Sequence, residues 1–332
     1  MKALVYTNPE ELTHRDEADP IPETGEVLIR VEAAGICGSD MHAFHGHDER
    51  RFPPLILGHE AAGTIAVGPR KGERVVVNPL MTCGQCDACL SGRSNLCAKR
   101  QIIGMNPREG AFAQYLRMPE RNLVTMPDGM DPVHAAATEP VATAWHAVGL
   151  AERASARPLA ECRALVLGAG AVGLTAGLVL AHRGCAGLRV GDTNALRRKT
   201  AIAAGCGDVY DPINDAGPED NGFDVVIDAV GGRITRQTAV AAVKPGGVIV
   251  HIGLMDNQDG LNVRKITLQE VTFVGTYTYT MVDFRATMAA LHAGALGRLD
   301  WIEARPLAAG LAAFRDLDAG RTAAAKIILQ PQ

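Results

Sequence analysis

Short hydrophobic runs broken by glycine, proline and acidic residues characterise the first 141 residues of the chain. Glu26–Val31, Gly63–Val67 and Arg74–Val77 are the clearest of these runs, and each is rich in β-branched residues. Runs of this kind between turn-forming residues are typical of β-strands. Because no helical periodicity of any length is found before about Pro132, we expect an irregular all-β unit in this part of the chain.

A different pattern begins at Cys162, where apolar runs alternate with helix-like stretches. A strand over Ala164–Leu167 leads through a glycine turn into an apolar helix over Val172–Arg183. Strands that alternate with helices in this way form a parallel, doubly wound sheet, so we predict an α/β fold class. A second strand is expected to end at Asp192. Three further strands are expected over Val225–Asp228, Val248–Ile252 and Val271–Tyr277.

The C-terminal part of the chain is too short to bury a core of its own. Met281–Ala293 has a helical pattern, and Ala323–Leu329 reads as a short strand. We expect this tail to rejoin the N-terminal β unit. The predicted domains are therefore residues 1–141 plus 281–332, with residues 142–280 inserted between the two pieces as a separate domain.

Composition narrows the class of protein. The 332 residues are 47% hydrophobic and 21% charged, and the formal net charge at pH 7 is −4, which argues against nucleic acid and anionic membranes as partners. The N-terminus reaches proline and acidic residues too early for the apolar region of a signal peptide. The longest weakly polar run, Gly168–Ala181, is too short to span a membrane. We expect a cytoplasmic protein.

A glycine motif of the form G-x-G-x-x-G follows the first strand of the inserted domain and opens its first helix. The backbone of such a turn can approach a pyrophosphate, which the N-terminus of the helix then holds. Packing alone could also explain the glycines. The cofactor-binding residues expected here are Gly168, Gly170, Val172 and Gly173.

Asp192 strengthens the prediction of a dinucleotide site because it stands nineteen residues beyond the third glycine, at the end of the next strand. A carboxylate there accepts hydrogen bonds from the adenosine ribose and repels a 2′-phosphate, so NAD is favoured over NADP. A simple helix cap is the alternative role for Asp192. Arg197 and Arg198 leave NADP open, because a nearby arginine can receive the additional phosphate.

Four cysteines are spaced C-x2-C-x2-C-x7-C within a glycine-containing loop. Four thiolates held this close can complete a tetrahedral shell around zinc, and such a closed shell is structural. Disulfides do not suit a cytoplasmic protein, and an iron–sulfur cluster is a weaker alternative for a loop without redox chemistry. These residues are Cys83, Cys86, Cys89 and Cys97.

A second set of metal-ligand types stands apart from the four cysteines. Cys37 lies in GICGSD, His59 and Glu60 lie in LGHEAAG, and Glu139 lies in ATEPVAT. One thiolate, one imidazole and one carboxylate would leave a fourth zinc position open, as catalytic sites do. Singly, the same residues could be a buried thiol, a turn histidine and a helix-start acid. Together they predict a zinc that acidifies a substrate hydroxyl for hydride transfer to a nicotinamide.

A route for the released proton is predicted just beyond Cys37. Ser39 supplies a hydroxyl and His42 an imidazole with a pKa near neutrality, and we count both as catalytic together with Glu60. Asp40 is a candidate outer partner for His59. The loop containing His45, His47 and Asp48–Arg51 is expected to be a solvated surface.

These motifs, in this order, resemble the zinc-containing medium-chain dehydrogenase/reductase family over nearly the whole chain. GICGSDMH, GHEAAG, the four-cysteine lobe, TEPVAT and GAGAVG carry the resemblance. It implies a GroES-like catalytic domain with a Rossmann domain, two zinc ions per subunit, NAD, and a homodimer or homotetramer. Catalytic zinc ligands are implied at Cys37, His59 and Glu60, with Glu139 near or on the metal.

The sorbitol (L-iditol) dehydrogenase branch is suggested because Glu139 stands where simple-alcohol members carry a cysteine. The implied reaction is hydride transfer from a secondary hydroxyl of a polyol-like substrate to NAD, which gives a ketone. Thr278 and Ala43 depart from residues typical of sorbitol dehydrogenases. A polyol phosphate or a threonine-like amino-alcohol is the alternative substrate. A zinc-free quinone reductase would lack the second ligand set, and a zinc-binding interaction module would be shorter.

Overall fold

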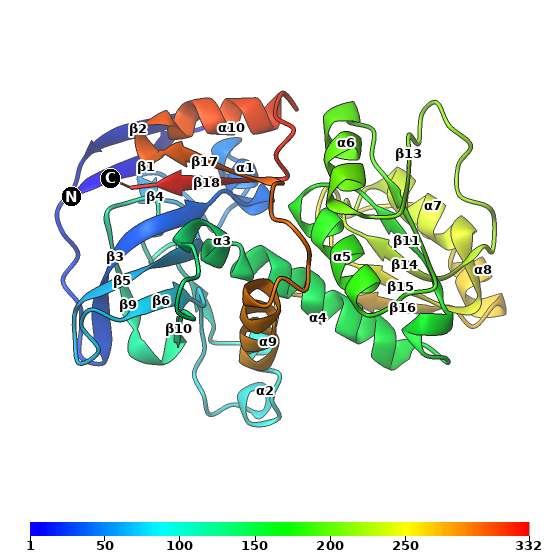
Figure 1. Ribbon diagram of the computed structural model, residues 1–332, viewed down its shortest axis with the longest axis horizontal. Helices are drawn as coiled ribbons and strands as arrows, with labels where there is room; N and C mark the ends of the chain where they lie inside the picture. The colour runs from blue at the N-terminus through cyan, green and yellow to red at the C-terminus, as the bar shows by residue number, and fades with distance from the viewer. Residues whose placement is uncertain (332) are drawn as a thin grey trace. The chain divides into compact units, whose positions relative to one another are not determined.

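The computed structural model describes residues 1–331 and divides them into two units (Figure 1). The first unit contains Met1–Pro140, Thr280–Ala293 and the chain from Ile302 onward, and the second contains Val141–Tyr279 and Gly294–Trp301. Gly294–Trp301, which the sequence pattern places in the catalytic domain, is grouped with the second unit in the structure. Within residues 1–331, no helix is both long and apolar enough to cross a membrane.

The first unit is built mainly of antiparallel strands. Its largest sheet has seven strands in the order β10-β6-β5-β3-β18-β17, with β9 also paired to β3. The strands of this sheet are β3 (Glu26–Gly35), β5 (Glu60–Val67), β6 (Arg74–Val77), β9 (Tyr115–Pro119), β10 (Leu123–Thr125), β17 (Ile302–Pro306) and β18 (Lys326–Gln330). Two small sheets contain β1 (Lys2–Asn8), β2 (Glu11–Asp16) and β4 (Leu55–Ile56), and β7 (Leu80–Met81) and β8 (Gln101–Ile102).

Strand β3 organises this unit because it contacts three neighbours. Its side chains alternate, so that Val27, Ile29 and Val31 are buried while Arg30 is exposed. Toward its end the alternation gives way to Ala33, Ala34 and Gly35, all buried. Small residues here leave room for the side chains of the neighbouring strands.

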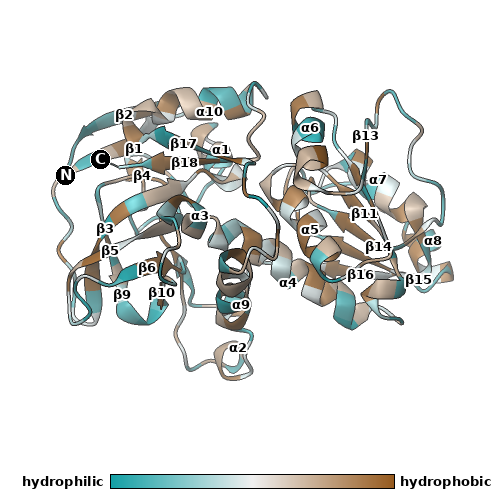
Figure 2. Cartoon of the chain, viewed as in Figure 1, coloured by the Kyte–Doolittle hydropathy of each residue, from teal (hydrophilic) through white to brown (hydrophobic). Residues whose placement is uncertain are grey.

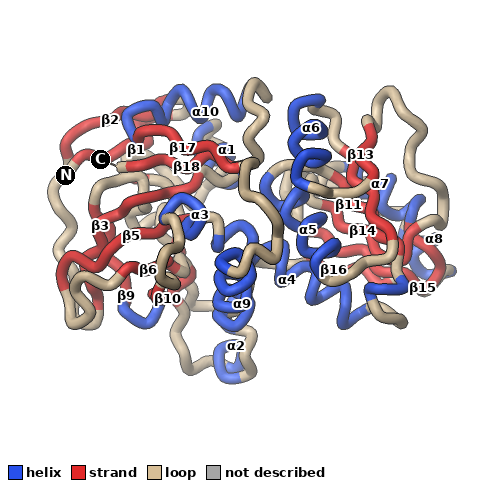
Figure 3. The backbone as a smooth tube through the Cα atoms, in the orientation of Figure 1, coloured by secondary structure: helices blue, strands red, loops and turns tan. Residues whose placement is uncertain are grey.

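Strand β18 belongs to the first unit and follows the last segment of the second along the chain. It pairs antiparallel with β3, with Ile328 opposite Gly35, and parallel with β17. The helices of this unit are short except for α9 and α10, and α4 begins in it (Figure 3). They are α1 (Gly38–Phe44), α2 (Asp87–Leu90), α3 (Pro132–Ala136), α9 (Met281–His292) and α10 (Gly310–Asp318), while α4 (Thr138–Ala154) has most of its residues in the second unit.

The second unit contains a six-stranded, wholly parallel sheet in the order β13-β12-β11-β14-β15-β16. Strands such as β11 and β14 are apolar along most of their length, as strands covered on both faces are (Figure 2). The α/β fold class is confirmed. The strands are β11 (Arg163–Leu167), β12 (Gly187–Gly191), β13 (Asp208–Tyr210), β14 (Phe223–Asp228), β15 (Val243–His251) and β16 (Thr272–Gly275), and the helices are α5 (Ala171–His182), α6 (Ala195–Ala204), α7 (Arg233–Ala242) and α8 (Val263–Leu268).

Candidate active site

Cys37, His59 and Glu60 lie together in the first unit. Each offers a ligand atom, and these three atoms lie within 4.8 Å of one another. Cys37 stands immediately before α1, and His59 and Glu60 stand where β5 begins. Because β3 and β5 are paired with Gly35 opposite Glu60, the end of one strand and the start of the next bring the three side chains to one place.

Glu60 is fully buried, and its two carboxylate oxygens have different surroundings. Oε1 accepts a hydrogen bond from Lys326 Nζ at 2.6 Å, whereas Oε2 has no hydrogen-bond partner. A Cβ at Gly35 would lie only 1.9 Å from Oε2, so glycine is required for the carboxylate to occupy this position. One oxygen of Glu60 is therefore held by a cation, and the other is left without a partner in the protein.

His59 is oriented by Asp40, which is also fully buried. His59 Nδ1 lies 3.5 Å from Asp40 Oδ1, and Asp40 Oδ2 accepts the backbone N–H of Cys37 at 3.0 Å. Although burial opposes a charge on His59, Asp40 and Cys37 raise the pKa of its imidazole well above the usual value. In the zinc-free protein a metal ion must displace this proton in order to bind.

The donor set fits a zinc ion. Glu60 Oε2 is buried without a hydrogen-bond partner, whereas His59 Nδ1 and Asp40 Oδ1 face each other at 3.5 Å. Buried polar atoms are rarely left unpaired, and an unpaired carboxylate oxygen beside a thiol and an imidazole indicates a missing ligand. A thiolate, an imidazole and a carboxylate form the mixed set that zinc takes when one position stays open to substrate.

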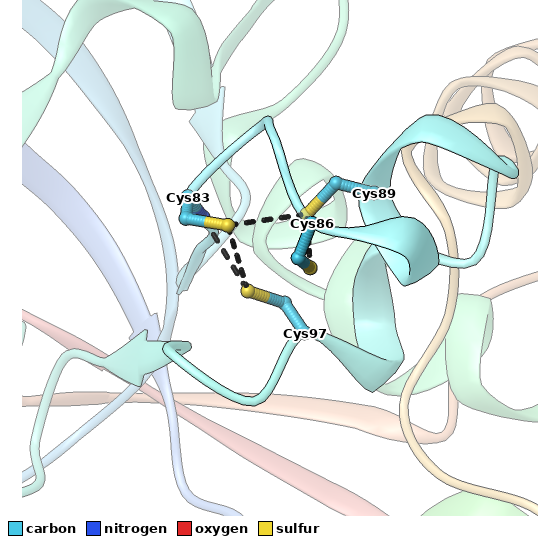
Figure 4. A group of neighbouring side chains, drawn as sticks. All are labelled: Cys83, Cys86, Cys89 and Cys97. Carbon is cyan, nitrogen blue, oxygen red and sulfur yellow. Dashed lines mark hydrogen bonds between the residues drawn. The ribbon is translucent and has the colours of Figure 1, made fainter.

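The four cysteines form a second cluster with the geometry of a closed metal shell (Figure 4). Their Sγ atoms are 3.5 Å apart for Cys83 and Cys97, 3.6 Å for Cys86 and Cys89, and 3.9 Å for Cys83 and Cys89. A tetrahedron with zinc–sulfur bonds of about 2.3 Å has sulfur–sulfur edges of about 3.8 Å. The thiols are unpaired and too far apart for disulfides, so this loop fits a structural zinc.

The glycine turn of the second unit has the open backbone that a dinucleotide needs. Gly168 has φ +96°, and a Cβ at Gly173 would lie 1.9 Å from the carbonyl oxygen of Gly168. Gly170 caps the N-terminus of α5 and faces open space, since a Cβ there would meet nothing within 4 Å. Val172 lies in the first turn of the same helix. The turn can receive a pyrophosphate on its N–H groups.

Asp192 holds this turn from the end of β12. Its Oδ2 accepts the N–H of Ala169 at 2.7 Å, and its Oδ1 accepts the N–H of Asn194 at 2.7 Å. Arg197 Nη1 lies 4.0 Å from Asp192 Oδ2, whereas Arg198 pairs with Asp211 at 2.8 Å. Of the two arginines near the expected ribose position, Arg198 therefore already forms an ion pair with Asp211.

Known proteins share both halves of this arrangement. Residues 23–128 match the family of alcohol dehydrogenase GroES-like domains, and residues 171–293 match the family of zinc-binding dehydrogenases. L-galactonate-5-dehydrogenase of Escherichia coli (strain K12) is 34% identical over 303 residues, which cover 86% of this chain and 85% of that protein. The chain belongs to the zinc-containing medium-chain dehydrogenase/reductase family.

Two further comparisons agree with this membership. Sorbitol dehydrogenase of Bacillus subtilis (strain 168) is 36% identical over 298 residues, which cover 84% of this chain and 82% of that protein. The structure of the alcohol dehydrogenase RspB from E. coli CFT073, complexed with NADH, superposes with a TM-score of 0.89 at 26% identity and covers 100% of this chain and 99% of that one. The prediction of an NAD(P)-linked, zinc-dependent alcohol dehydrogenase is confirmed.

The remaining residue that the family resemblance places near the metal is Glu139. It lies in the first turn of α4 and is buried, at 6% exposure. It is not part of the group of three whose ligand atoms lie within 4.8 Å, the only such group besides the four cysteines among residues 1–331. The negative charge of Glu139 nevertheless acts on Lys326, so Glu139 belongs to the electrostatic surroundings of the site.

Lys326 was missed by the sequence analysis of this dehydrogenase. Its side chain is 2% exposed, and Nζ donates to the carbonyl oxygen of Ile36 at 2.7 Å as well as to Glu60. Burial opposes its charge, but Glu60 and Cys37 raise the pKa of Lys326 above its ordinary value. The signal in the sequence was a single lysine inside the apolar strand AAAKIIL, where a charge requires a buried partner.

The proton-relay candidates Ser39 and His42 lie one turn apart on α1. The prediction that Asp48–Arg51 forms part of a solvated surface is wrong for Arg51, whose side chain is fully buried. Arg51 Nη1 donates to the carbonyl oxygen of Ser39 at 3.0 Å, and its Nη2 lies 3.3 Å from Ser39 Oγ. The guanidinium is balanced by Asp48 at 2.7 Å. Arg51 therefore fixes both the backbone and the hydroxyl of Ser39.

The imidazole of His42 is suited to accept a proton. Partial burial lowers the pKa of His42, and Asp48 opposes this effect only in part. A lowered pKa favours the neutral form of the ring, which is the form that can accept a proton.

Proposed function

We propose that this dehydrogenase oxidises a secondary hydroxyl of a small polyol-like or sugar-acid-like substrate to a ketone, with NAD as the hydride acceptor. The observation that carries the proposal is the group of Cys37, His59 and Glu60, in which Cys37 is partly buried and the other two are buried. The group offers three different ligand types and would leave a fourth position for a substrate oxygen. The names of the relatives that act on L-galactonate and sorbitol support the substrate class.

In the proposed mechanism, zinc is held by Cys37, His59 and Glu60, and Asp40 orients His59. When bound, zinc supplies the Lewis acidity that lowers the pKa of the substrate hydroxyl. Ser39 then takes up the hydroxyl proton while passing its own outward, and His42 carries the proton to solvent. Glu139 adds negative charge close to the group, which holds the cations of the site in place.

The second unit supplies the cofactor site in this proposal. Gly168, Gly170 and Gly173, with Val172, receive the pyrophosphate on the first turn of α5. Asp192 accepts the adenosine ribose hydroxyls and disfavours a 2′-phosphate, so NAD is the preferred cofactor. Arg197 is the residue that would admit some use of NADP, because it is partly exposed and lies 4.0 Å from Asp192.

We further propose a cytoplasmic homodimer or homotetramer. Strand β16 is an edge strand of the parallel sheet, and Val263 and Leu268 on the preceding helix α8 are exposed apolar side chains. An unpaired edge beside apolar side chains is favourable for pairing with a second copy. The eight unpaired cysteines suit a reducing compartment. Light scattering after gel filtration measures the subunit number directly.

The test of the function is NADH formation with a panel of polyols, sugar acids, polyol phosphates, threonine and simple secondary alcohols. Each assay is run on the purified enzyme, after removal of zinc, and after zinc is restored. We expect zinc-dependent NADH formation with polyols or sugar acids. Turnover confined to polyol phosphates or threonine would overturn the substrate class, and turnover that survives complete loss of zinc would overturn the mechanism.

A further inference from the structure

Lys326 and Glu60 form an ion pair from which water is excluded. Their side chains are 2% and 0% exposed, and Nζ lies 2.6 Å from Oε1. The ammonium is anchored from the other side by the carbonyl oxygen of Ile36, the residue before Cys37. The lysine is thereby fixed between Glu60 and the residue that precedes Cys37, although it is itself no ligand.

The carboxylate of Glu60 faces this cation with one oxygen only. Its other oxygen, Oε2, is buried without a hydrogen-bond partner, and the Glu60 carboxylate is one of the three groups whose ligand atoms lie within 4.8 Å of one another. When zinc is bound, two cations therefore share one carboxylate. When zinc is absent, Lys326 is the only fixed cation that touches Glu60 among the residues that the structure describes.

We propose that Lys326 is a positioning residue that competes with the catalytic zinc for the charge of Glu60, and so stabilises the zinc-free site while keeping the zinc exchangeable. This inference rests on the proposed function, since it requires that Glu60 faces a zinc ion. It assigns to the chain a built-in counter-ion that sets how tightly the catalytic metal is held.

Replacing Lys326 should affect the zinc-free protein more than the zinc-loaded protein, and this difference sets the direction of the change in zinc affinity. Removing one member of a buried ion pair is strongly destabilising, because the other charge is left uncompensated. In the zinc-free protein, replacing Lys326 removes the ion-pair partner of Glu60 and leaves only the more distant His59 beside the carboxylate, whereas in the loaded protein zinc still compensates its charge. The substitution therefore raises the free energy of the zinc-free state more than that of the loaded state. By linkage, zinc must then bind more tightly.

The experiment compares wild type with Lys326→Met, which removes the charge, and Lys326→Arg, which keeps it. Lys244→Met is the matched control, because Lys244 pairs with Asp224 at 2.7 Å on the second unit. Zinc loss to a coloured chelator is followed over time, and unfolding midpoints are measured before and after catalytic zinc is removed. The zinc of the four cysteines, held in the same chain, is the internal reference for folding.

We expect catalytic zinc to leave Lys326→Met at least about tenfold more slowly than wild type. Its zinc-free form should unfold at a lower temperature than zinc-free wild type, and added zinc should narrow that gap. Lys326→Arg and Lys244→Met should behave as wild type, and the zinc of the four cysteines should leave all variants at one rate. In a Glu60→Gln background, adding Lys326→Met should no longer change the rate of zinc loss. This double variant also serves as a second test if Lys326→Met alone does not fold.

Faster loss of catalytic zinc from Lys326→Met would overturn the proposal, because Lys326 would then only support Glu60 as a ligand. An unchanged rate, or persistence of the effect in the Glu60→Gln background, would overturn it as well. Failure of the proposed function gives a different result. If wild type and Cys37→Ser bind the same amount of zinc, the site at Cys37 is not a zinc site, and this inference falls with it.

Discussion

Gly35 lies directly opposite Glu60 where β3 and β5 pair, and the absence of a side chain on Gly35 creates the space that the Glu60 carboxylate fills. A Cβ there would lie 1.9 Å from Glu60 Oε2, closer than any real contact. The strand that precedes Cys37 therefore also shapes the position of the carboxylate beside it.

Gly35→Ala should consequently displace Glu60 and weaken the catalytic site. We expect the variant to lose catalytic zinc, to retain the zinc of the four cysteines, and to lose at least about a hundredfold in kcat/KM, as removal of a main electrostatic contributor does. Zinc analysis and NADH assays measure both effects. Gly38→Ala is the control, since a Cβ at Gly38 meets nothing within 4 Å. Full zinc content in Gly35→Ala would show that the carboxylate can move aside without consequence.

Cys97→Ser should remove the structural zinc. Cys97 is buried and its sulfur lies 3.5 Å from that of Cys83, so its loss opens the tetrahedral shell. We expect one zinc fewer per chain and a lower unfolding temperature, with NAD binding unchanged because the cofactor site belongs to the second unit. Cys185→Ser is the comparison variant. Two zinc ions remaining in Cys97→Ser would contradict the assignment of this loop.

Asp192→Ala should shift cofactor preference toward NADP. The substitution removes both the ribose acceptor and the hydrogen bond to the Ala169 N–H, so activity with NAD should fall while the repulsion of a 2′-phosphate disappears. We expect the ratio of kcat/KM for NAD to that for NADP to fall at least about tenfold. Asp208→Ala, at an exposed carboxylate, is the control. An unchanged ratio would mean that another group reads the ribose.

Arg51→Met should slow the reaction without releasing zinc. The variant loses the hydrogen bonds to Ser39 and Gly104, so the Ser39 hydroxyl is no longer fixed in the proton relay. We expect a fall in kcat of about tenfold to a thousandfold, with NAD affinity and zinc content preserved. Stopped-flow hydride transfer measured across pH separates this effect from simple loss of fold. Wild-type kcat in the variant would exclude Ser39 positioning as the role of Arg51.

Acid should weaken the protein through Asp48. Burial opposes its charge, but hydrogen bonds from Arg50 and the charge of Arg51 lower the pKa of Asp48 from 3.8 to about 2. A carboxyl group whose pKa is lower in the folded protein stabilises the fold at pH values above 3.8, its pKa in the unfolded chain. This contribution disappears as pH falls toward about 2.

Asp48→Asn should therefore be less stable than wild type at neutral pH by about 2 kcal/mol, and the two proteins should converge as pH falls through this window. Denaturant unfolding at a series of pH values measures the difference. Glu49→Gln, at the exposed neighbouring position, is the control. A difference that stays constant down to the lower end of the window would assign the effect to packing rather than to charge.

Local spacing accounts for the parts of the site that could be predicted from the sequence. The four cysteines, the glycine turn and the pair His59-Glu60 each lie within a short segment, so their chemistry is visible in the order of residues. The fold class followed for the same reason, because alternating strands and helices leave a periodic pattern.

Lys326 and Arg51 could not be placed in this way, because their partners are distant in sequence. Lys326 is 266 residues from Glu60, and Arg51 is 53 residues from Gly104. A polar run such as HDERRF is usually solvated, and only the tertiary fold shows that Arg51 turns inward to Ser39. Charges inside apolar strands and arginines beside proline-rich turns are the sequence signals worth testing for buried partners.

The position of β18 also has a consequence for how the protein is made. Strand β18 lies between β3 and β17 in the largest sheet of the first unit, yet it is synthesised only after the whole parallel sheet of the second unit. While the ribosome is still translating the second unit, β3 has no partner along one part of its edge and Glu60 has no lysine. The parallel sheet of the second unit lies in one continuous segment and can fold during translation, whereas the zinc site is completed later. An unfinished chain would therefore carry an open strand edge that invites aggregation until its final strand arrives.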